Sequence, residues 1–156
     1  MLRITKQADY GIVLMTQFGH EEPGALLSAK ELAERTRIPG PMVAKILKIL
    51  HRAGLLVSQR GVSGGYGLAR PADSISLLEM IAALEGPVSM TECSDVGAGC
   101  PIEAGCRPRV NWKLINQVVQ SALEGVTLAR MIAPAPACAT LDASLVRAGL
   151  ETPNAS

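Results

Sequence analysis

Three cysteines, Cys93, Cys100 and Cys106, fall within fourteen residues and are separated by six and five others. The stretch that carries them is rich in glycine and cannot pack a core of its own, whereas free structural cysteines are usually buried in regular elements. Three thiols in one loop therefore indicate a metal site. Soft thiolates suit zinc, copper(I) or an iron–sulfur cluster. Zinc is the weaker candidate because pairs at C-x-x-C spacing are missing; the non-metal alternative is three unrelated thiols.

The remaining chemically active side chains form no catalytic group. Cys138 lies far along the chain from the three cysteines, and we expect it to be a reactive bystander. The chain has two histidines, His20 and His51, which we expect to be surface or packing residues. An enzyme would need a nucleophile with a base, or an acid and base pair, in one cleft. The sequence therefore predicts a protein that is not an enzyme.

The formal net charge of +1 hides two halves of opposite sign. Residues 1–70 contain ten Lys and Arg against five Asp and Glu, giving +5, whereas residues 71–156 contain five against nine, giving −4. Aromatic residues make up 3% of the chain, which excludes an aromatic stacking platform for single-stranded nucleic acid. The basic half, however, suits the phosphates of a duplex.

Two short helices joined by a tight turn are expected in the basic half. Ser28 and Glu31 form a capping box at the start of the first helix, which follows a longer helix over residues 5–20. Gly40 is expected to cap the second helix, with Pro41 as its first residue. This second helix should run to about Ala53 and bury one stripe at helical spacing, made of Val43, Ile46, Leu47 and Leu50.

A β-hairpin is expected directly after the second helix. Residues 55–60 and 66–70 read as its strands, and the glycine-rich loop 61–65 between them should need positive backbone angles. Helix, turn, helix and hairpin together predict a winged helix-turn-helix that reads double-stranded DNA; the alternative is any helical hairpin with a solvated basic face. The candidate DNA contacts are Met42, Lys45 and Lys48 toward the major groove, and Arg60, Ser63 and Tyr66 in or near the wing.

The acidic half has a different organisation. A helix of residues 110–124 has a long apolar face that needs a partner, either its own DNA-binding domain or, as we expect, a second copy of the chain. The fold class is thus mainly α with a small β wing plus a long dimerisation helix. The predicted divisions are a winged domain at 1–72, a connecting helix at 73–90, a cysteine-rich loop at 91–108, a dimerisation helix at 109–132 and a tail at 133–156.

No membrane partner is expected, because the longest apolar runs are only a few residues. The first residues, Met1-Leu2-Arg3-Ile4, do not resemble a secretory signal. The cytoplasm is therefore the predicted location, and disulfides are not expected there.

Several of these motifs, in this order, resemble the Rrf-type winged-helix regulators of bacteria, which include the Isc regulator and a nitric-oxide-sensing repressor. The resemblance runs from residue 1 to about Ile132. It is carried by Leu2-Arg3-Ile4-Thr5-Lys6, Ala8-Asp9-Tyr10-Gly11, Arg60-Gly61-Val62-Ser63-Gly64-Gly65-Tyr66 and Thr91-Glu92-Cys93. A finer likeness, to the regulator of the Suf iron–sulfur assembly system, is carried by Leu84-Glu85-Gly86-Pro87, Asn111-Trp112 and Glu124-Gly125-Val126-Thr127-Leu128-Ala129.

The resemblance implies a homodimeric transcriptional regulator, in the first instance a repressor. In it Cys93, Cys100 and Cys106 each bind iron of a 2Fe-2S or 4Fe-4S cluster, and cluster loading sets the affinity for promoters such as those of cluster-assembly genes. A nitric-oxide or redox-sensing repressor of the same family is the nearest alternative. A cluster carrier is a further one, although a carrier has no use for a wing and a basic helix.

This chain departs from the family at one position. Some members place a histidine three residues after the last cysteine as the fourth ligand, whereas Arg109 stands there and cannot coordinate iron. The likeness to the nitric-oxide sensor implies that Asp9 completes the site from the other subunit. Glu103 is a local alternative, and a surface carboxylate or an ion-pair partner is the simpler role for Asp9.

Overall fold

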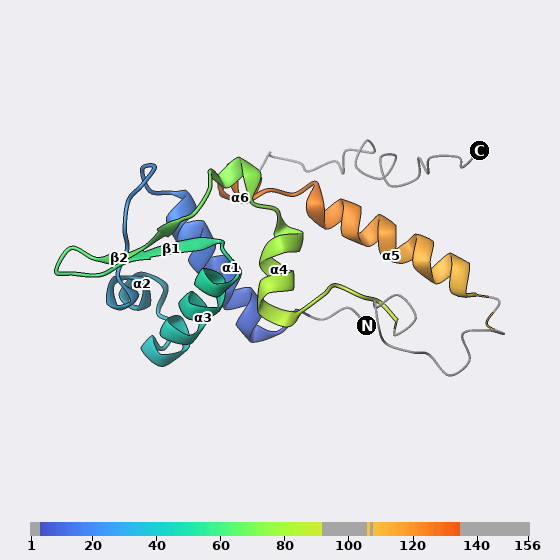
Figure 1. Cartoon of the computed structure of the whole chain (residues 1–156), viewed down its shortest axis with the longest axis horizontal. Helices are drawn as coiled ribbons and strands as arrows, with labels where there is room; N and C mark the ends of the chain where they lie inside the picture. The colour runs from blue at the N-terminus through green and yellow to red at the C-terminus, as the bar shows by residue number, and fades with distance from the viewer. Residues whose placement is uncertain (1–3, 92–105, 107, 135–156) are drawn as a thin grey trace.

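The computed structural model describes residues 4–91, 106 and 108–134 (Figure 1). Within that part the chain forms six α-helices, one short 3-10 helix and a two-stranded antiparallel sheet. The mainly helical fold with a small β wing is confirmed. The elements are α1 (Lys6–Gly19), α2 (Ala29–Thr36), α3 (Gly40–Arg52), β1 (Leu56–Gln59), β2 (Gly65–Leu68), η1 (Ala72–Ser74), α4 (Leu77–Glu85), α5 (Arg109–Glu124) and α6 (Leu128–Ile132).

The helix-turn-helix consists of α2 and α3. The predicted capping box is present: the Ser28 hydroxyl accepts from the Glu31 amide at 3.1 Å, and the Glu31 carboxylate accepts from the Ser28 amide. Arg37, in the left-handed region at φ 58°, ends α2 and starts the turn. Helix α3 begins one residue earlier than predicted, with Pro39 as its cap and Gly40 in its first turn. Pro41 is tolerated one position further in because first-turn amides have no helical partner.

The predicted stripe on α3 forms the centre of the core. Val43, Ile46, Leu47 and Leu50 are all fully buried. They pack with side chains from α1 and α4, which lie against α3. The apolar spacing in α3 therefore determines which face of the helix turns inward and leaves the lysines between these residues on the outside.

The wing is the antiparallel pair β1–β2, in the register Leu56↔Leu68 to Gln59↔Gly65. A third segment lies along β2, because Leu27 and Tyr66 exchange two backbone hydrogen bonds of 2.8 and 2.9 Å. The expectation that the loop glycines need positive angles holds for Gly61, at φ 122°, among the glycines of the hairpin. Gly64 and Gly65 are required for another reason: a Cβ there would lie 2.3 Å from the Gln59 oxygen or 2.7 Å from the Leu27 oxygen.

The end of the described chain returns to the winged domain. The segment predicted as one dimerisation helix, residues 109–132, contains two helices: α5 ends at Gly125, and α6 turns back to pack on α1 and η1. Backbone hydrogen bonds fix this return, from the Leu77 amide to the Val126 oxygen at 2.7 Å and from the Leu128 amide to the Ile75 oxygen at 2.8 Å. Leu128 is fully buried in the common core. The core of the winged domain thus includes side chains of α4 and α6.

Helix α5 extends to one side of the molecule, away from the wing (Figure 1). Its N-terminal half carries four exposed large apolar residues, Val110, Trp112, Leu114 and Ile115, of which Val110 is 74% exposed. Large apolar side chains exposed in one stretch of helix indicate an interface with another molecule. None of the helices in the described residues is long and apolar enough to cross a membrane.

Acid is expected to weaken the start of α4 through Glu79. The Ser76 amide, and next the Arg70 guanidinium at 2.7 Å, lower the pKa of Glu79 below its usual range. A lowered carboxyl pKa stabilises the fold above the usual pKa, and this stability is lost as the pH falls through the lowered value. Between pH 7 and pH 3 the free energy of unfolding in urea should change less in Glu79→Gln than in wild type. The difference should be at most about 1 kcal/mol, since the Arg70–Glu79 ion pair is partly exposed. Glu124→Gln is the control, and equal pH profiles for Glu79→Gln and wild type would contradict the assignment.

Candidate nucleic-acid interface

The outer face of α3 presents the cations predicted for the major groove. Lys45 and Lys48 are exposed and, three residues apart, lie on the same side of the helix. Met42 is only half-buried but packs against the core cluster, so part of its side chain is used inside the protein. Two of the three predicted residues on α3 are therefore fully available to a duplex, and both would contact it through charge.

The wing presents the other predicted contacts. Arg60 follows β1 directly, and Arg60 and Ser63 are exposed, on either side of Val62, whose side chain is entirely exposed. Tyr66 differs from them, because it is half-buried in β2, where its backbone pairs with both Ser58 and Leu27. The structure thus places Arg60 and Ser63 at the tip, and Tyr66 where it supports the hairpin.

One residue at the junction of α3 and the wing, His51, was predicted to have only a surface or packing role. Its Nδ1 lies 2.9 Å from the Leu56 carbonyl oxygen, and its Nε2 lies 3.4 Å from the Ser58 hydroxyl. Its ring meets the Tyr66 ring edge to face, with centroids 6.2 Å apart. No sequence pattern marks this role, because the partners become neighbours only once the hairpin folds back on the helix.

The predicted metal ligands lie mostly beyond the part of the chain that can be described. Cys93, Cys100 and Glu103 are outside the described residues. Cys106 is half-buried just before α5, and Asp9 is exposed in the first turn of α1. Residues 4–91, 106 and 108–134 contain no cluster of three or more His, Cys, Asp or Glu side chains that could hold a metal.

Hydrogen bonds connect the segment before the cysteine-rich loop to α5, and the start of α1 to the end of α4. Before the loop, the Met90 amide donates to Oδ1 of Asn116, a buried residue of α5, and the Gln120 side-chain amide donates to the Val88 oxygen at 2.8 Å. The start of α1 is bonded to the end of α4, since the Thr5 amide donates to the Glu85 carboxylate at 2.7 Å. The first turn of α1, which carries Asp9, therefore lies beside the helix from which the loop departs.

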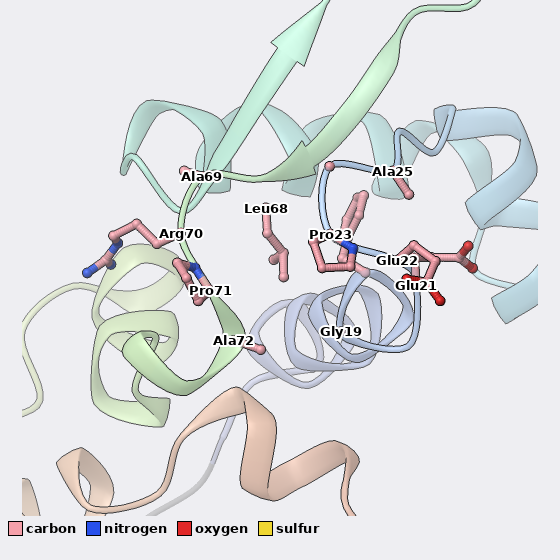
Figure 2. A pocket seen from close by; sticks show the side chains of 12 residues that line it. Gly19, Glu21, Glu22, Pro23, Ala25, Leu68, Ala69, Arg70, Pro71 and Ala72 are labelled. Carbon is pink, nitrogen blue, oxygen red and sulfur yellow. The ribbon is translucent and has the colours of Figure 1, made fainter.

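A cavity of about 400 Å³ lies on the other side of the wing base, between the end of α1 and the link from β2 to η1 (Figure 2). Leu68 and Pro23 project into it, and Arg70 and Glu21 point away from its centre. Arg70 is paired with Glu79, and Glu21 with Arg35. The walls are thus mainly apolar, and these two charged groups are already engaged.

The sequence of this chain is similar to those of known transcriptional regulators. The profile of the Rrf2 family, described as iron-dependent transcriptional regulators, matches residues 4–134. A Synechocystis protein, slr0846, named as an HTH-type transcriptional regulator, is 33% identical over 128 residues, which cover 82% of this chain and 86% of that protein.

Two solved structures agree with this match. The structure of CymR, the global cysteine regulator of B. subtilis, superimposes with a TM-score of 0.67 at 27% identity, covering 85% of this chain and 97% of that one. T. potens IscR superimposes with a TM-score of 0.64 at 26% identity, covering 84% and 86%. The matched proteins with an assigned role are named as regulators, in agreement with the expectation that the chain is not an enzyme.

Proposed function

The chain belongs to the Rrf2 family of transcriptional regulators, and from that membership we propose a cytoplasmic, homodimeric repressor that binds promoter DNA through α3 and the wing. We further propose that an iron–sulfur cluster on Cys93, Cys100 and Cys106 sets its DNA affinity, and that it controls genes of iron–sulfur cluster assembly. One observation carries the DNA-binding part: two lysines are exposed on α3, and an arginine is exposed on the wing that follows this helix.

The predicted contacts favour phosphate and shape recognition over base recognition. Lysine and arginine on an exposed face attract phosphates regardless of sequence. Met42 cannot make the bidentate hydrogen bonds with which Arg, Asn or Gln distinguish bases. We therefore propose that sequence preference comes largely from the shape and deformability of the duplex.

The homodimer is supported by α5. The helix extends from the body of the molecule (Figure 1), and its four exposed apolar side chains are uncovered within the described part of the chain. A second copy, related by a two-fold axis, would cover those of both chains at once. It would also bring two α3 helices and two wings to paired half-sites, the usual arrangement for helix-turn-helix proteins.

The donor set fits an iron–sulfur cluster. Thiolates are the standard ligands of such clusters, and the chain offers three within fourteen residues, of which Cys106 is half-buried beside α5. Asp9, on the turn bonded to the end of α4, is proposed as the fourth ligand, with Glu103 as the alternative. A bound iron–sulfur cluster would link the cysteine-rich loop to the helices before and after it, and this link would respond to oxidants and to the supply of iron. Helix α4 packs on both α1 and α3, which connects the loop to the DNA-binding helix.

Removing the wing arginine tests the DNA-binding part. Arg60→Ala should weaken binding at least about tenfold near 0.1 M salt and lower the slope of log K against log salt by about 1.8, the value for one lost phosphate contact in each subunit of the dimer. The probe is the duplex that the wild-type chain selects from a random-sequence library. Arg130→Ala removes an exposed cation on α6, away from the wing, and should bind like wild type. Unchanged affinity of Arg60→Ala across the salt series would overturn the assignment.

Anaerobic purification tests the cluster. The wild-type protein should be coloured and contain iron and sulfide, and Cys93→Ala, Cys100→Ala or Cys106→Ala should each abolish the visible absorption. Cys138→Ala should keep it and serves as the control. Binding to the selected duplex with and without the cluster then gives the sign of regulation. A colourless or zinc-loaded wild-type protein would rule the cluster out.

A further inference from the structure

His51 connects the DNA-binding helix to the wing. It lies in the last turn of α3, and its ring contacts both wing strands: Leu56 and Ser58 on β1 through the two ring nitrogens, and Tyr66 on β2 through the ring edge. Other contacts between α3 and the hairpin, such as the Leu55 amide to the Leu50 oxygen, lie at the chain connection itself. The imidazole thus joins α3 to the wing beyond the connecting turn.

The hydrogen bonds fix the tautomer of the neutral ring. A carbonyl oxygen can only accept, so Nδ1 carries the hydrogen and donates to Leu56. Nε2 is then unprotonated and accepts from the Ser58 hydroxyl. The nitrogen that can take up a second proton is therefore Nε2. After protonation both nitrogens donate, the bond to Leu56 is kept, and the Ser58 hydroxyl turns to accept.

The position of His51 would put the added charge on the proposed interface. Lys45, Lys48 and His51 recur every three residues and share one side of α3. On β1 and β2 the side chains facing the ring are uncharged, and Tyr66 is the titratable one among them. On α3 the neighbouring charges are Lys48 and Arg52, both cationic. A proton on His51 thus extends a row of cations toward the wing, and bound phosphates would favour it.

We propose that His51 is a positioning residue that holds the wing against α3 and, when its ring is protonated, strengthens DNA binding. The proposal rests on the DNA-binding function proposed above. Bound phosphates favour the charged form of the ring, and a proton favoured in the bound state makes binding tighter as the pH falls. Affinity should therefore rise on acidification and decline as the pH increases.

The test separates the two roles of the ring. Affinity of the full-length, anaerobically purified chain for the library-selected duplex is measured from pH 5.5 to pH 8 in wild type, His51→Asn and His51→Ala. Asparagine places an N–H donor where Nδ1 lies but does not titrate. His51→Asn should match wild type within about twofold at pH 8 and lose the rise in affinity, of up to about tenfold, seen in wild type at pH 5.5. His51→Ala should bind more weakly than wild type at both pH values.

His20→Asn is the matched control, because the other histidine of the chain is exposed at the end of α1. It should keep the wild-type pH profile. A wild-type rise that persists in His51→Asn, or a His51→Ala that binds like wild type at pH 8, would overturn the proposal while leaving DNA binding intact. A wild-type chain that selects no duplex would instead overturn the DNA-binding function on which the proposal rests.

Discussion

Leu128→Ala is expected to lower the free energy of unfolding of the winged domain by about 2–5 kcal/mol, the usual cost of truncating a fully buried leucine. Leu128 is completely buried although it lies in the last short helix, far along the chain from the rest of the core. It packs beside α1, where a Cβ on Gly19 would lie 3.5 Å from Leu128 Cγ. Its amide also donates to Ile75, so loss of its packing should loosen the whole return of α6.

Urea unfolding followed by circular dichroism measures this effect. The protein concentration must be the same for every variant, since dimerisation adds to the apparent stability. Arg130→Ala, an exposed substitution on the same helix, should change the free energy of unfolding by less than about 0.5 kcal/mol. If Leu128→Ala unfolds at the same urea concentration as wild type, α6 is not part of the core of the winged domain.

Gly65→Ala is expected to push the wing strand β2 away from Leu27. The added Cβ would lie 2.7 Å from the Leu27 oxygen and 2.9 Å from the Leu27 carbonyl carbon, and both atoms belong to the backbone. A rotamer change cannot relieve such contacts, so Leu27 must move away from Tyr66. The two hydrogen bonds between them would be weakened, at about 0.5–1.5 kcal/mol each. We expect a loss of about 2 kcal/mol in stability and of more than tenfold in affinity for the selected duplex.

Gly40→Ala is the control for Gly65→Ala. No atom lies within 4 Å of a Cβ built on Gly40, which is in the first turn of α3. Alanine is favoured over glycine inside a helix by roughly 0.5–1 kcal/mol, but a side chain before a proline is disfavoured in helical backbone. These two effects oppose each other, so the midpoint of thermal unfolding should stay close to that of wild type. Should Gly65→Ala bind the duplex and unfold like wild type, the close approach of the wing to Leu27 does not matter for either property.

The parts of the fold that depend on neighbouring residues could be predicted from the sequence. The apolar stripe on α3 and the Ser28–Glu31 capping box each depend on residues within one or two helical turns of one another, and the structure confirms both. Glycines next to a strand indicated the hairpin. The expected need for a positive φ was wrong for Gly64 and Gly65. These two glycines instead allow a close approach of other backbone atoms. For Gly65 the close approach depends on where Leu27 lies, which no local pattern gives. For Gly64 it depends on how the turn closes onto Gln59.

The features that join distant segments could not be predicted. Gly125 and Thr127 mark a break after α5, but no local pattern shows that α6 then turns back to pack on α1. His51 is three residues beyond Lys48 on an exposed face, and its partners on β1 appear only after the hairpin folds against α3. The lysines predicted to contact DNA do lie on the exposed face of α3, but their contact with DNA stays a prediction. The pairing of Tyr66 with Leu27 could not be read from the sequence.

The return of α6 also bears on the order of events during synthesis. The core of the winged domain includes Leu128, so it is incomplete until the last helix has been made. At about 5–20 residues per second, the ribosome adds the stretch from Cys93 to Ile132 in a few seconds. All three loop cysteines therefore leave the ribosome before α6 does, and so before the domain can complete its core. A metal that reached them in that interval would meet a nascent chain whose DNA-binding domain is still unfinished.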